Sequence, residues 1–191
     1  MAIKLIVGLG NPGKDYQSHR HNVGFWFCDA LANLHSATFK KEAKFFGDVA
    51  QASIAGVSVR LLKPTTFMNR SGQSIQALAN FYQLEVDEIL VVHDELDLEV
   101  GIAKLKVEGG HGGHNGLRDT IKALGSKAFY RLRLGIGHPG NKTQVADFVL
   151  HAPNKSELGH IQNALVDALQ VIEEVVKGNI DQAMKSLHTK G

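Results

Sequence analysis

The stretch Ile3–Leu9 (IKLIVGL) decides the fold class, because it is short, almost continuously apolar and interrupted only by Lys4 before the first glycines. A run of this kind predicts a strand that is covered on both faces, as in a sheet packed between helices. The next apolar segment, Phe25–Leu34, has the spacing of an amphipathic helix. A buried strand followed by such a helix indicates an α/β protein.

The same patterns continue along the chain. They predict strands at Asp48–Ala55 and Val57–Lys63 (paired around Gly56, with Pro64 ending the second), Glu88–His93 and Arg131–Gly137, and helices at Ser74–Tyr82, Leu117–Leu124 and from Leu158 to a C-terminal glycine at Gly178. We therefore expect a single domain over residues 1–191. Its fold should be a twisted, mostly parallel or mixed sheet flanked by helices in a three-layer α/β/α arrangement.

Composition narrows the class of protein. The 191 residues carry a net charge of +2, with 43% hydrophobic and 21% charged residues, which is ordinary globular usage and not that of a disordered chain. A single cysteine excludes a disulfide framework and a zinc site built on cysteine pairs. The first residues are too short an apolar run for a signal peptide, and no run is long enough to cross a membrane. These features predict an intracellular, cytoplasmic protein.

Positive charge is concentrated in one segment. Residues 104–142 contain eight lysines and arginines but only two acidic residues. This run is either a solvated basic face or the footprint of a polyanion such as RNA. Within it, Arg131–Gly137 alternates cations with apolar residues, so we expect a strand with one wet, positive face.

The loop Gly8–Gly13 fits the dinucleotide fingerprint G-x-G-x-x-G, and with Lys14 it fits most of a phosphate-binding loop. However, Pro12 lacks a main-chain donor, and Asp15 stands where a hydroxyl would hold Mg²⁺. A nucleotide-binding protein built on this loop remains the alternative interpretation. The preferred interpretation is a rigid turn that presents Asn11 at the carboxyl end of the first strand.

Several polar segments follow strands and are candidates for chemistry. His21 lies just before the first helix, and Asp94 ends a strand, where a carboxylate can orient an imidazole. The segments Thr65–Gly72 and Gly109–Gly116 also contain polar side chains, although helix caps and core packing would explain some of them. Two histidines in the second segment do not make a convincing metal site. Cys28 lies on the apolar stripe of a predicted helix, so we expect it to be a core residue and not a nucleophile. The sequence also contains no G-x-S-x-G motif that would hold a nucleophilic serine.

Taken together, these segments resemble the bacterial-type peptidyl-tRNA hydrolase family. The resemblance is carried, in the family's order, by GLGNPG (8–13), Tyr16 with RHN (20–22), KPTTFMNRSG (63–72), HDELDL (93–98), GGHGGHNGLRD (109–119) and RLRLGIGHPG (131–140). It implies an enzyme that cleaves the ester between an N-blocked peptide and the 3′-terminal ribose of tRNA. It also implies release of tRNA for reuse after premature ribosome drop-off, with no cofactor, no metal and no obligate protein partner, by a monomer.

The resemblance also implies roles for individual residues. His21 would be the general base, Asp94 would orient it, and Asn11 would distinguish a blocked α-amine from a free one. At the tRNA end, Met68 would line the floor and His114 the rim. The other implied contacts to tRNA are Tyr16, Phe67, Asn69 and Asn115 at the acceptor end and Lys104, Lys106, Arg133 and Lys142 along the phosphate backbone. A third interpretation is a non-catalytic RNA-binding module on the 104–142 face.

Overall fold

The computed structural model describes residues 1–189, and within that range seven strands form one sheet in the order β2-β3-β4-β1-β5-β7-β6. The strands are β1 (Leu5–Gly8), β2 (Lys40–Glu42), β3 (Gly47–Ile54), β4 (Val57–Pro64), β5 (Ile89–Glu95), β6 (Ala103–Lys106) and β7 (Tyr130–Gly135). The four central strands β4, β1, β5 and β7 are parallel, whereas β2, β3 and β6 run antiparallel to their neighbours. The expected mixed α/β sheet is confirmed.

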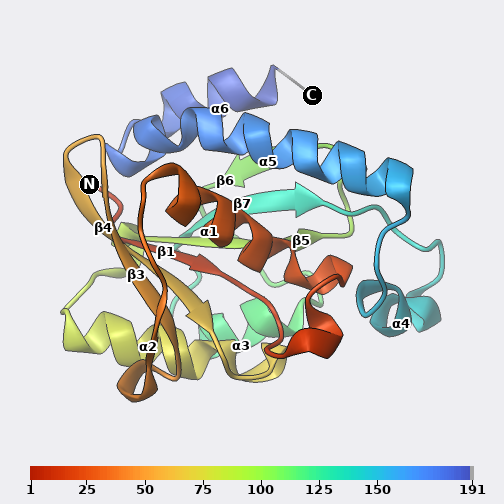
Figure 1. Cartoon of the computed structure of the whole chain (residues 1–191), viewed down its shortest axis with the longest axis horizontal. Helices are drawn as coiled ribbons and strands as arrows, with labels where there is room; N and C mark the ends of the chain where they lie inside the picture. The colour runs from red at the N-terminus through yellow and green to blue at the C-terminus, as the bar shows by residue number, and fades with distance from the viewer. Residues whose placement is uncertain (190–191) are drawn as a thin grey trace.

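Helices cover both faces of the sheet. They are α1 (Val23–Leu34), α2 (Ser71–Phe81), α3 (Asn115–Leu124), α4 (Val145–Val149), α5 (Lys155–Val176) and α6 (Ile180–His188). Figure 1 shows α5 and α6 on one side of the sheet and α2 and α3 on the other. Every helix in residues 1–189 is too short or too polar to cross a lipid bilayer.

Alternation along β1 explains the three layers. Ile6 packs into the core under α1, α5 and α6, while Leu5 and Val7 pack into the core under α2 and α3. Because successive side chains of a strand point to opposite faces, a strand buried on both sides must be apolar throughout. The interpretation of the N-terminal stretch as a doubly covered strand is therefore confirmed.

Several boundaries differ from the sequence prediction. α2 begins at Ser71 and α3 at Asn115, each a few residues earlier than expected, because polar first turns carry no apolar periodicity. The short elements β2, β6, α4 and α6 were not anticipated. Gly178 does follow the long helix with a φ of 89°, as a C-terminal glycine should, and its N–H donates to Val175 O over 3.0 Å.

The predicted wet, positive face of β7 is wrong for Arg131. This side chain is buried, with 1% of its surface exposed, whereas Arg133 two residues later is only partly covered. Alternation places both cations on the same face, but Phe129 and the main chain of the 109–110 loop cover only the first.

Candidate active site

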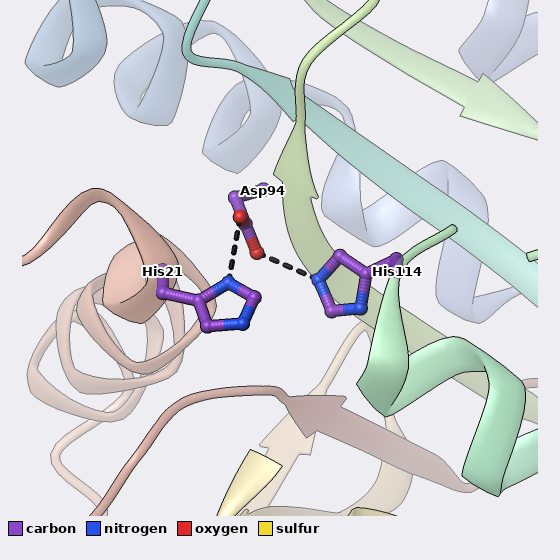
Figure 2. A group of neighbouring side chains, drawn as sticks. All are labelled: His21, Asp94 and His114. Atoms are coloured by element: carbon purple, nitrogen blue, oxygen red, sulfur yellow. Dashed lines mark hydrogen bonds and ion pairs between the residues drawn. The ribbon is translucent and has the colours of Figure 1, made fainter. Parts of the chain in front are cut away.

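The carboxyl ends of β1 and β5 bring His21 and Asp94 together across 73 residues of sequence. His21 is the middle residue of a 3₁₀ turn, Arg20–Asn22, that leads into α1, and Asp94 lies near the end of β5. His21 Nδ1 is 2.8 Å from Asp94 Oδ2. The two residues paired in the sequence analysis are therefore in direct contact, as Figure 2 shows.

Charge and burial oppose each other at this pair. Burial is the largest influence on His21 and disfavours its charged form, but the charge and hydrogen bond of Asp94 together outweigh it and raise the pKa of His21 above its usual 6.5. Burial likewise disfavours the Asp94 carboxylate, yet the two neighbouring imidazoles hold its pKa well below the ordinary value. Asp94 is thus ionised and accepts the proton of His21 Nδ1, which leaves the lone pair at Nε2 of neutral His21 free.

His114 contacts the other oxygen of the same carboxylate. Its Nε2 lies 2.7 Å from Asp94 Oδ1, and its ring centroid lies 5.0 Å from that of His21. His114 Nδ1 accepts the N–H groups of Gly116 and Leu117 at the start of α3. Because Nδ1 is an acceptor, the ring proton must be on Nε2 and is donated to Asp94. His114, expected at the rim, lies in the structure beside the carboxylate.

A third imidazole, His93, packs behind His114. Its Nδ1 donates to the main-chain oxygen of Asp94 at 2.8 Å, and its ring meets the His114 ring edge to face at 5.2 Å between centroids. Complete burial is the main cause that lowers the pKa of His93 to about 3, and the neighbouring imidazole of His114 adds to it. His93 is therefore neutral and supports His114 without adding charge to the site.

Asn11 is fixed by two buried neighbours. Its Oδ1 accepts the N–H of Met68 at 2.7 Å, while its own main-chain N–H and C=O bond to the side chain of Asn22, each over 2.9 Å. The bond to Met68 sets the orientation of the Asn11 amide, so its Nδ2 donors are presented away from Met68. Asn22 belongs to the RHN motif at residues 20–22, and its position beside His21 is the only signal in the sequence for this role.

The remaining acceptor-end candidates surround this cluster. Met68 is buried, and the α3 residue Gly116 packs so closely on it that a Cβ there would lie 2.6 Å from Met68 Sδ. Tyr16 and Phe67 meet edge to face with ring centroids 6.0 Å apart, and Phe67 keeps 56% of its surface exposed. Asn69 and Asn115 are exposed, and Asn115 Oδ1 accepts from Arg118 at 2.9 Å.

Three of the four candidate phosphate-binding cations, Lys104, Lys106 and Arg133, lie on β6 and β7 at one edge of the sheet, and Lys142 begins the 3₁₀ turn Lys142–Gln144 that follows β7. β6 and β7 pair with Lys104 opposite Arg133, so these two side chains share a face. Lys106 and Lys142 are exposed, and Arg133 lies 3.9 Å from Glu95. In the order of the strands, this edge is on the side of β5 away from β4.

The glycine loop 8–13 does not form a phosphate cradle. A Cβ on Gly8 would lie 2.2 Å from Gly24 O, so the glycine serves close packing of β1 against α1. The loop leads into a 3₁₀ turn, Lys14–Tyr16, and α1 begins only at Val23. A cavity of about 610 Å³ beside the loop is lined by two carboxylates, Asp29 and Asp48, and two lysines, Lys14 and Lys63, so its lining carries no excess of positive charge for a phosphate. These features argue against the nucleotide-binding alternative.

Three side chains of the cluster could in principle ligate a metal ion. One ligand atom each from His21, Asp94 and His114 lies within 4.8 Å of the others. However, each imidazole already uses one ring nitrogen in a hydrogen bond to Asp94, and His114 Nδ1 accepts the N–H of Gly116 at the start of α3. A metal held by all three side chains through the nitrogens that face Asp94 would have to displace the hydrogen bonds of His21 and His114 to this carboxylate.

Comparison with known proteins decides the family. The family model described as peptidyl-tRNA hydrolase matches residues 5–191. The chain belongs to this family. It is 69% identical over 190 residues to peptidyl-tRNA hydrolase of Ruthia magnifica, covering 100% of both chains, and 53% identical over 188 residues to that of Neisseria meningitidis serogroup A, covering 98% of both. It is therefore similar to hydrolases over its full length.

The fold of the family matches as well. The crystal structure of peptidyl-tRNA hydrolase from Acinetobacter baumannii superposes with a TM-score of 0.95 at 47% identity, over 97% of this chain and 94% of that one. The resemblance carried by the sequence motifs is therefore confirmed by family model, by relatives and by structure.

Proposed function

We propose that His21 acts as the general base in the hydrolysis of peptidyl-tRNA. The family, its relatives and the similar structures support this reaction and do not favour nucleotide binding. The observation that carries the assignment of the base is that Asp94 accepts the Nδ1 proton of His21 and leaves Nε2 free. A neutral imidazole held in this tautomer can take a proton from water.

The proposed reaction needs no covalent intermediate on the enzyme. Water attacks the ester carbonyl while His21 Nε2 accepts one of its protons, and the resulting imidazolium is stabilised by ionised Asp94. The carbon–oxygen bond to the 3′ oxygen of the ribose then breaks, and that oxygen takes the proton back from His21. The products are tRNA with its terminal hydroxyl restored and a peptide carboxylic acid, which releases the remaining proton of the attacking water to the solvent and becomes a carboxylate.

Asn11 is proposed to recognise the blocked amine. Because its Oδ1 is held by Met68 N–H, the side chain offers N–H donors to the substrate. A peptide carbonyl can accept these donors, whereas a free α-ammonium would place donors against donors and leave buried amide groups unpaired. The enzyme would therefore spare aminoacyl-tRNA.

The other candidates are assigned to the nucleic acid. Exposed Phe67 and its neighbour Tyr16 offer aromatic faces to the terminal bases, and Asn69 and Asn115 offer amides to ribose or peptide groups. Met68 forms the floor, and His114 lies beside Asp94. The cations Lys104, Lys106, Arg133 and Lys142 contact phosphates, which positions many tRNAs without reading their sequence. We further infer a single-domain monomer that works in the cytoplasm, where its substrate arises.

A paired hydrolysis assay tests this function. One tRNA is charged with either an N-acetylated amino acid or the free amino acid, and both are offered to the wild type and to Asn11→Ala. We expect wild type to cleave the blocked ester alone, and Asn11→Ala to lose much of that preference. Failure of the folded wild type to cleave either ester would overturn the enzyme assignment and favour the RNA-binding module.

A further inference from the structure

Arg131 is a buried cation in the middle of β7 that the reaction described above does not use. Its guanidinium bonds to three main-chain carbonyls: Nη1 to Gly110 O at 2.6 Å, and Nη2 to Gly109 O and to Lys127 O, the latter at 3.1 Å. The group also stacks on Phe129, with 4.3 Å to the ring centroid. A buried charge is costly unless it is hydrogen-bonded, and because Arg131 Nε has no partner, the carbonyls that accept from Nη1 and Nη2 must stay in place around the group.

Two of these carbonyls belong to the loop that joins β6 to α3. Among the hydrogen bonds of the described residues, those that tie positions 108–113 to a distant part of the chain come from Arg131, whereas the Gly113 and His114 N–H groups bond locally to His111. The loop is rich in glycine, and Gly109, Gly112 and Gly113 all adopt positive φ, so the backbone itself imposes little order. Arg131, which lies on β7 outside the loop, thus holds the otherwise flexible glycine segment through the carbonyls of Gly109 and Gly110.

Both ends of the loop carry residues of the proposed site. At one end, the side chain of Lys106 lies against Gly109, where a Cβ would come within 2.7 Å of Lys106 Nζ. At the other end, His114 contacts Asp94, and Asn115 begins α3. A shift of the loop would therefore move the second imidazole on Asp94, whereas Lys106 stays in β6, where it is paired with Arg131 of β7.

We propose that Arg131 is a positioning residue that fixes the 108–113 loop, and through it His114 and Asn115, and that it does not bind tRNA phosphate. This inference rests on the proposed function for its consequence in catalysis, but the anchoring itself is independent of activity. Arg133, two residues away on the same face of β7 and partly exposed, has the opposite role as a phosphate contact.

The two arginines make a matched pair for the test. Arg131→Lys keeps the charge but loses the planar fork that reaches several carbonyls at once. We expect kcat to fall about tenfold, because displacement of a site by about 1 Å costs up to ~10²-fold, while the salt dependence of KM stays as in wild type. Arg131→Met should lose more than Arg131→Lys. Arg133→Ala should instead raise KM and reduce the slope of log KM against log salt by about one.

Hydrogen exchange supplies a readout that does not depend on activity. The amides of Gly113 and His114 bond to His111 within the loop. In Arg131→Lys these amides should exchange at least tenfold faster, with the midpoint of denaturation near that of wild type, and in Arg133→Ala their exchange should be unchanged. Wild-type kcat and exchange in Arg131→Lys, or a salt slope reduced as in Arg133→Ala, would overturn the proposal. An inactive wild type would refute the proposed function and leave the exchange test intact.

Discussion

Asp94 carries its charge in a position closed to water, and each of its oxygens accepts an imidazole N–H. One of these donors, His114, has its tautomer fixed by α3, whereas the other, His21, keeps a free lone pair. The chemistry of the site therefore depends on which of two similar side chains has its second nitrogen occupied. This distinction predicts different effects for substitutions of the three residues.

The pH dependence follows from the raised pKa of His21. The base must be neutral, so kcat/KM of wild type should rise with pH through a midpoint above 6.5 and then level off. In Asp94→Asn, burial is no longer opposed by the carboxylate, and the midpoint should move to lower pH. The plateau should also fall by about 10²-fold or more, because the tautomer is no longer held. An unchanged midpoint in Asp94→Asn, measured by initial rates from pH 5 to 9, would contradict this account of the pair.

His114 has two separable tasks. Its Nδ1 caps α3, and its Nε2–H supports Asp94. His114→Asn keeps a good capping side chain but loses the bond to Asp94, so kcat should drop about tenfold with little loss of stability. His114→Ala should show the same drop in kcat and in addition cost about 1 kcal/mol of unfolding free energy, as measured by urea titration. Equal stability of the two variants would argue against the cap.

At the scale of elements, the site depends on how closely α1 lies on the sheet. A Cβ on Gly24 would lie 2.5 Å from Val92 O in the middle of β5 and 2.6 Å from Leu9 N just after β1, both of them main-chain atoms. Since backbone cannot move as a flexible side chain does, α1 and the preceding turn with His21 would have to shift.

Two glycine substitutions test this contact. Gly24→Ala should destabilise the protein by about 1–3 kcal/mol and reduce activity, because it overpacks the interface. Gly159→Ala is the matched control, since this glycine lies inside α5 with no atom near the added Cβ, and it should stabilise by about 0.5–1 kcal/mol. Thermal or urea unfolding of both variants measures the difference. A neutral Gly24→Ala would mean that α1 can move without cost.

Elements with strong periodicity could be predicted from the sequence, and the others could not. The apolar run of β1 is typical of a buried strand, and the apolar residues of α5 recur at helical spacing. β6 is a four-residue edge strand, AKLK, whose pattern is equally that of a loop. The site was predictable where motifs fixed residue types, as for His21 and Asp94. The contact of His114 with Asp94 was not, because it depends on how the 109–114 loop folds back.

Arg131 shows why burial is difficult to infer from alternation. The period of β7 correctly places Arg131 and Arg133 on one face, but it does not say what covers that face. Phe129 directly precedes β7, and the glycine loop follows β6. Together they cover Arg131 and leave Arg133 partly exposed.

On the scale of the whole molecule, the order of the strands separates the tasks. Three of the candidate cations, Lys104, Lys106 and Arg133, lie on β6 and β7 at one edge, and the imidazole cluster lies over β1 and β5 near the middle. On the proposed function, a tRNA held by these cations would place its acceptor end at His21. The net charge of +2 is small, so the attraction must come from this local group.

This arrangement predicts a uniform effect of salt. Lys106→Ala should weaken binding by a similar factor for different tRNAs and lower the salt slope by about one, because phosphate contacts carry no sequence information. Binding of two unrelated tRNAs between 50 and 200 mM salt measures this. Lys40→Ala, on β2 at the opposite edge, is the control and should leave the slope unchanged. A loss confined to one tRNA would argue for sequence-specific contacts.

The most direct test of the central claim is single-turnover hydrolysis of N-acetyl-aminoacyl-tRNA by wild type and by His21→Ala, with and without added imidazole. If His21 is the base, the folded variant should be slower by about 10²–10⁴-fold, and imidazole should restore part of the rate. Circular dichroism and tRNA binding serve to confirm that the variant is folded. Cleavage by folded His21→Ala at the wild-type rate would contradict the account and assign the activation of water to another group.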